Sequence, residues 1–107
     1  MAYRRLVSKL TKENLWMYIL AMLTERPMYG YEVANELRSR FQIDVATITV
    51  YVVLYRMSAE GLVRRLTDRG NKLGLRKVFY QVTERGLEAF KDGLRFIEET
   101  LRTLAKT

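Results

Sequence analysis

The sequence predicts a mainly α-helical fold with one small β-hairpin, in the order of a winged helix-turn-helix domain followed by a long terminal helix. Three observations predict this fold class. Apolar residues recur at helical spacing in several stretches, two short β-rich segments flank a glycine-containing basic loop, and the order is three helices, a hairpin and a last helix. This order divides the 107 residues into a winged-helix domain over residues 1–82 and a terminal helix over residues 83–107.

The first two helices follow from the spacing of their apolar residues. Residues 11–24 carry apolar side chains on nearly every side, which is typical of a buried central helix. Its tryptophan, Trp16, is most simply a core residue, with stacking on a flat ligand as the alternative. Pro27 and Gly30 mark a turn, and a second helix with one apolar stripe is expected over residues 28–40.

The third helix, expected from Thr47 to Gly61, is the most ambiguous segment because its first half is rich in β-branched and aromatic residues. We favour a helix because apolar residues repeat at helical spacing, with Thr47 as the expected N-cap and Gly61 in the left-handed C-terminal position. Projection at about 100° per residue turns Val50, Val53, Leu54 and Met57 inward. The outward face then consists of Ile48, Thr49, Val52, Tyr55, Arg56 and Ala59.

Residues 62–67 and 77–82 mix β-formers with charges and predict a hairpin with a long basic tip. The last helix is expected after Thr83 and continues to about Lys106. Its apolar residues are spaced 3, 4, 3, 4 and 3 apart, which is a strict heptad seam. The seam consists of Leu87, Phe90, Leu94, Ile97, Leu101 and Leu104. A partner helix, and hence a homodimer, is expected to cover it; the alternative is a helix folded back on its own domain.

The net charge of +7 is concentrated in two short segments. Residues 1–12 carry four basic residues and no acid, and residues 62–82 carry six basic residues and one acid. Such clustering suits a polyanion such as double-stranded DNA. The N-terminal bases are expected to form an arm along DNA, with a disordered tail as the alternative.

Composition excludes most enzymes. The chain has no cysteine and no histidine, which removes thiolate chemistry, the usual zinc ligands and the commonest general base. No catalytic or nucleotide-binding motif appears, so we expect neither an enzyme nor a cofactor. The longest apolar stretch, residues 15–23, is too short to span a membrane and carries no cleavage pattern, which favours a cytoplasmic protein.

Three blocks of residues 14–90 resemble the PadR-type transcriptional regulators. They comprise Pro27, Gly30, Tyr31 and Glu32; then Thr49, Tyr51, Leu54, Met57, Glu60, Gly61, Leu62 and Val63; and finally Arg76, Lys77, Phe79, Tyr80, Thr83, Glu84 and Gly86. Ile48 and Val52 depart from the glycine and proline that the family usually has there. The family's long C-terminal extension is absent, so the chain is similar to the subgroup with a single terminal helix. The resemblance implies a homodimeric repressor that binds an inverted-repeat operator, with a small-molecule effector left open.

The residues expected to contact DNA lie on the third helix, in the wing and at Tyr31. They are Tyr31, Thr47, Thr49, Tyr51, Val52, Tyr55, Arg56, Arg64, Arg69, Lys72, Arg76 and Lys77. Basic side chains can meet phosphates, and apolar groups on the third helix can pack on thymine methyls. For the two tyrosines a place in the core is an equally good account. A module that binds another protein through the apolar third helix is the alternative function.

Overall fold

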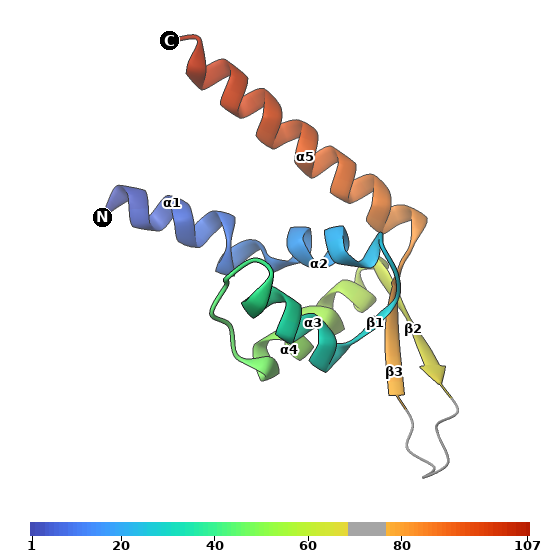
Figure 1. The fold of residues 1–107 in the computed structure, drawn as a ribbon. Coiled ribbons are helices and arrows are strands. Elements are labelled where there is room, and N and C mark those ends of the chain that lie inside the picture. Colours follow the sequence, from blue (N-terminus) through green and yellow to red (C-terminus); the bar gives the residue numbers. More distant parts are fainter. Residues whose placement is uncertain (69–76) are drawn as a thin grey trace.

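The computed structural model describes residues 1–68 and 77–107 and has the predicted winged-helix architecture (Figure 1). The helices are α1 (Ala2–Leu10), the short 3-10 helix η1 (Lys12–Asn14), α2 (Leu15–Leu23), α3 (Gly30–Ser39), α4 (Thr47–Ala59) and α5 (Glu84–Ala105). The strands are β1 (Met28–Tyr29), β2 (Val63–Asp68) and β3 (Lys77–Val82), in the sheet order β1-β3-β2. Mainly helical structure with a small antiparallel sheet confirms the predicted fold class.

The core lies where α2, α3 and α4 meet the sheet. Ile19 and Leu20 of α2, Leu37 of α3 and Leu54 of α4 are all fully buried there, and Tyr80 of β3 closes the core from the sheet. The prediction of a central helix is therefore right for one side of α2. Its other side is only half-buried and faces α5.

The predicted boundaries of the first two helices need correction. Residues 12–14 form a 3-10 turn, so the helix expected from Thr11 begins at Leu15. The helix expected from Met28 begins at Gly30, because residues 28 and 29 pair instead with Tyr80 and Phe79 of β3. Backbone pairing with a distant strand outweighs the local helical pattern here, and the sequence gives no signal for it.

The N-terminal segment is a helix, which corrects the alternative of a disordered tail, and its place as an arm along DNA stays a prediction. Its apolar residues recur at spacings of three, one and three and form one stripe, which we call the α1 stripe: Tyr3, Leu6, Val7 and Leu10. None of the residues of α1 is buried in the chain. Two hydrogen bonds hold its end, from the Thr11 hydroxyl to the Val7 carbonyl at 2.6 Å and from the Tyr18 hydroxyl to the Leu10 carbonyl at 2.6 Å. Figure 1 shows α1 and α5 projecting from the body of the domain.

The ends of α4 and α5 are fixed by local chemistry. Ala46 is the N-cap of α4, so Thr47 is not the cap that we expected but the first helical residue. Gly61 has φ of 79°, which confirms the left-handed residue predicted after α4. Thr83 caps α5, where its hydroxyl oxygen accepts a hydrogen bond from the Gly86 N–H at 3.0 Å.

Candidate nucleic-acid interface

The outward face of α4 is exposed as the helical projection predicts. Val50, Leu54 and Met57 are buried and Val53 is half-buried, whereas the six predicted outward residues are all exposed. Ile48 and Tyr55 leave 72% and 74% of their surface in solvent. A helix that exposes such large apolar side chains is suited to contact with another molecule.

Tyr31 and Tyr51 are surface residues, exposed by 54% and 41%, so a place in the core is excluded for both. Tyr51 packs across the first turn of α3, because a Cβ added to Gly30 would lie 2.4 Å from its Cε1 atom. Only glycine at position 30 allows the ring to lie there. The two helices of the helix-turn-helix unit are therefore in direct contact through Tyr51.

Thr47 belongs to a hydrogen-bonded junction between α3 and α4. One Arg38 nitrogen, Nη1, donates to the Val45 carbonyl at 2.9 Å and to the Thr47 hydroxyl at 3.3 Å. The other, Nη2, donates to the Asn35 side-chain oxygen at 2.9 Å. Arg38 thus holds the start of α4 against α3, and sequence reasoning missed it because its partners are seven and nine residues away.

The N-terminal basic segment reaches the α4 face at one place. Lys12 and the α4 residues Thr49, Val52 and Arg56 border one open hollow of about 780 Å³. Two of the predicted basic or polar contacts therefore share a surface with a cation from outside the helix-turn-helix unit. Glu13 and Glu60 line the same hollow, so its lining carries charges of both signs.

The predicted wing residues are only partly described. Arg64 lies on β2, where its Nε donates to the side-chain oxygen of Gln81 on β3 at 2.8 Å. The Lys77 ammonium lies 4.8 Å from the centre of the Tyr29 ring. Arg69, Lys72 and Arg76, which the sequence places at the wing tip and its base, lie outside the described residues.

Three acidic residues of the domain form ion pairs with neighbouring cations. Two Arg40 nitrogens donate to the two Glu25 carboxylate oxygens at 2.9 and 2.6 Å, and these hydrogen bonds lower the pKa of Glu25 below its ordinary value. A hydrogen bond from Lys9 at 2.8 Å lowers the pKa of Glu13 in the same way. Arg26 pairs with Glu32 at 2.7 Å. A neighbouring cation therefore offsets the charge of each of these three carboxylates.

The predicted seam on α5 divides into two parts. Leu87 and Phe90 are half-buried in their own domain, and Phe90 packs against the core. Beyond Gly93 the seam is open, with Leu101 and Leu104 each 67% exposed. The alternative of a helix packed on its own domain is therefore right for the first turns of α5. The rest of the seam is uncovered within the described chain.

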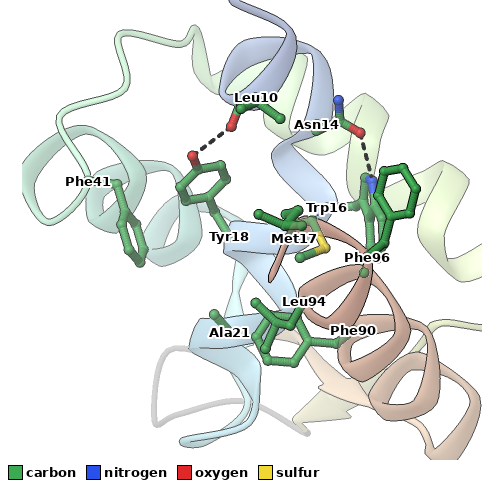
Figure 2. Close-up of a pocket in the computed structure, with 12 residues that line it drawn as sticks. Leu10, Asn14, Trp16, Met17, Tyr18, Ala21, Phe41, Phe90, Leu94 and Phe96 are labelled. Carbon is green, nitrogen blue, oxygen red and sulfur yellow. Dashed lines mark hydrogen bonds between the residues drawn. The ribbon is translucent and has the colours of Figure 1, made fainter. Parts of the chain in front are cut away.

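An apolar hollow of about 550 Å³ lies between α2 and α5, and we call it the α2–α5 hollow. Figure 2 shows Trp16, Met17 and Ala21 of α2 facing Phe90, Leu94 and Phe96 of α5. The helices approach closely at Gly93, where an added Cβ would lie 2.6 Å from the Met17 sulfur. Leu10 of the α1 stripe lines the same hollow.

An exposed helix after a helix-turn, next to a hairpin, defines a winged helix-turn-helix protein. The chain belongs to the transcriptional regulator PadR-like family, whose profile matches residues 19–92. Within the described ranges, no helix is long and apolar enough to cross a membrane.

Solved structures agree with this family. A PadR-like transcriptional regulator from Bacillus cereus is 27% identical over 94% of this chain and 99% of its own, with a TM-score of 0.72. A PadR family transcriptional regulator from Eggerthella lenta is 26% identical over 99% of this chain and 95% of its own, with a TM-score of 0.78. These relatives are transcriptional regulators and not enzymes. The family resemblance and the expectation that the chain is not an enzyme are therefore both confirmed.

The structure of Bacillus subtilis PadR in complex with operator DNA shares the fold of this chain. It is 22% identical over 75% of this chain and 46% of its own, with a TM-score of 0.69. A comparison with proteins of curated function gave no significant match.

Proposed function

We propose that this protein is a repressor that binds an inverted-repeat operator as a homodimer, with residues 1–82 contacting DNA and residues 83–107 holding the dimer. The observation that carries the proposal is the exposed outward face of α4 beside the hairpin. A winged-helix protein inserts this helix into the major groove, and the basic wing meets the flanking backbone. The structure of Bacillus subtilis PadR, which is in complex with operator DNA, supports DNA as the partner.

Two uncovered apolar surfaces support the homodimer. The open seam of α5 from Leu94 to Leu104 and the α1 stripe both belong to helices that project from the domain (Figure 1). A second copy presents the same two surfaces, so a two-fold dimer covers all four at once. Dimeric winged-helix proteins read two half-sites, which is why the operator is expected to be an inverted repeat.

The α2–α5 hollow is where a small-molecule effector would bind. Its volume of about 550 Å³ lies in the range of ligand sites, and aromatic side chains such as Trp16 and Phe90 line it. A flat aromatic compound could stack on the Trp16 ring there. Because Trp16 is the only tryptophan, its fluorescence reports occupancy directly. Unchanged fluorescence across a panel of planar aromatic compounds would argue against an effector site there.

The test of the function is a titration with duplex DNA from the region upstream of the protein's own coding sequence, carried out at several salt concentrations. A shuffled duplex of equal composition is the control. We expect preferential binding of the upstream duplex and a steep loss of affinity with salt, because phosphate contacts release counterions. A protein-interaction module would bind both duplexes weakly, and that outcome would reject the proposal. Action on operator DNA supports the expectation of a cytoplasmic protein.

A further inference from the structure

Two neighbouring arginines of the wing, Arg64 and Arg65, face opposite sides of the sheet. Arg64 is opposite Gln81 and Arg65 is opposite Tyr80 in the antiparallel register. Side chains opposite each other in such a pair share one face, and successive residues alternate between faces. Tyr80 is 7% exposed and belongs to the core, so Arg65 lies on the face that packs on the helices. Arg64 lies on the other face, hydrogen-bonded to Gln81.

Arg65 borders a hollow between α4 and β2, which we call the α4–wing hollow. It measures about 390 Å³ and is lined by Tyr51, Tyr55, Ser58, Ala59, Arg65 and Tyr80. Tyr55 and Ala59 of this set also belong to the outward face of α4. The hollow therefore opens at the edge of the surface that the proposed function places in the major groove.

The chemistry of the α4–wing hollow suits a phosphodiester. The described residues that line it are one arginine, three tyrosines, one serine and one alanine, and no acidic residue is among them. Arginine donates several hydrogen bonds in a fixed geometry that matches phosphate oxygens, and hydroxyls donate to the same atoms. Tyr51 is held at the hollow by its contact with Gly30.

We propose that the α4–wing hollow binds one phosphodiester of the DNA backbone, next to the groove occupied by α4, and that Arg65 and not Arg64 is the wing-strand arginine that contacts it. This inference rests on the proposed function. It differs from the expectation from sequence, which named Arg64, because alternation along the strand alone does not tell which of the two arginines faces α4. The Tyr55 hydroxyl is the second donor, because its side chain is 74% exposed at the mouth of the hollow.

The two arginines form a matched pair for the test, since both substitutions remove one positive charge from adjacent positions of one strand. Fluorescence anisotropy with the operator duplex gives the affinity of the wild type, Arg65→Ala, Arg64→Ala and Tyr55→Phe over a range of salt concentrations. We expect Arg65→Ala to weaken binding about tenfold and to reduce the salt slope by about one unit, as for a lost phosphate contact. Arg64→Ala should change the affinity less than threefold, and Tyr55→Phe should weaken binding without changing the slope.

A second measurement locates the contact. Duplexes that carry one neutral methylphosphonate at successive positions should show one position whose penalty disappears in the Arg65→Ala variant and persists in Arg64→Ala. Equal effects of the two arginine substitutions, or a penalty that no variant removes, would overturn the inference and leave the proposed function intact. A wild type that binds no duplex would overturn both. Arg65 and Tyr55 are exposed, so thermal melting of these variants should match the wild type.

Discussion

Gly30 and Tyr51 contact each other across the helix-turn-helix unit, with the ring of Tyr51 lying where a Cβ of residue 30 would be. The separation from Cε1 would be 2.4 Å, and from the hydroxyl oxygen 2.9 Å. The Tyr51 ring can therefore lie against α3 only because Gly30 has no side chain. Since Tyr51 borders the α4–wing hollow, this contact links the first turn of α3 to the proposed phosphate site.

Gly30→Ala should impair DNA binding more than folding. The Tyr51 ring is 41% exposed and can move outward, and alanine is the better helix former by up to about 1 kcal/mol. We expect the free energy of unfolding in urea to change by less than about 1 kcal/mol, whereas operator affinity falls severalfold. Unchanged affinity would show that the position of the Tyr51 ring is immaterial to binding.

Gly86→Ala should instead reduce the stability of the fold. A Cβ at position 86 would lie 2.1 Å from the Leu62 carbonyl oxygen, which is backbone and accepts hydrogen bonds from Thr83. Because this carbonyl cannot rotate away, we expect a loss of about 3 kcal/mol in the free energy of unfolding. Urea denaturation measures it directly, and a loss under about 1 kcal/mol would mean that the joint between β2 and α5 adapts.

The dimer should depend on the open part of the seam. Leu94→Asp combined with Leu101→Asp places charges on it, and sedimentation should then show a monomer with weakened operator binding. Arg95→Asp with Arg102→Asp is the control, because these exposed residues lie one position past the seam and face outward. A dimer that survives the leucine substitutions at unchanged affinity would reject the terminal helix as the interface.

Base recognition should depend on thymine methyl groups. Ile48, Val52 and Tyr55 are exposed on α4 and cannot read guanine with paired hydrogen bonds. Replacing thymine by uracil removes only the methyl group, so affinity should fall for the wild type and fall less for Val52→Ala. Equal binding of thymine and uracil duplexes, or an operator dominated by G·C pairs, would contradict methyl recognition.

Acid should weaken the ion pair between Glu25, after the end of α2, and Arg40, after the end of α3. The pKa of Glu25 is lowered by its hydrogen bonds with Arg40, so the carboxylate binds its proton less readily in the folded state. Its stabilising effect is present at neutral pH and disappears as the pH falls below about 4.3 and through the lowered value. Urea denaturation of Glu25→Gln should therefore show a shallower pH dependence in that window than the wild type; parallel curves would contradict this.

The sequence predicts those parts of the fold that local patterns determine. Apolar spacing identified the core helices, the exposed face of α4 and the end of α4 at Gly61. It missed β1, because two residues carry no pattern and pair only with a strand some fifty positions away. It also missed the helical form of residues 2–10, because basic residues there are interspersed with the apolar ones and none of the segment is buried.

The candidate site was predictable in outline and not in detail. A charge count locates a basic wing, but only the register of β2 and β3 separates Arg64 from Arg65. The contact between Gly30 and Tyr51 and the junction made by Arg38 join residues on different helices. Such contacts depend on the tertiary arrangement, which a single sequence does not encode in any short-range spacing.

Helix α1 has nine residues, and none is buried in its own chain. A helix this short is marginal in water, because its few backbone hydrogen bonds barely repay the ordering of the first turn. In the proposed dimer, the surface that covers Tyr3, Leu6, Val7 and Leu10 would therefore also stabilise the helix itself. In the proposed dimer, ordering of the N-terminal segment and pairing of the two chains become one cooperative step. The helical content of the protein should then rise with its concentration. On dilution the dimer would dissociate, α1 would unfold, and the N-terminal bases would no longer be held in one position against the operator.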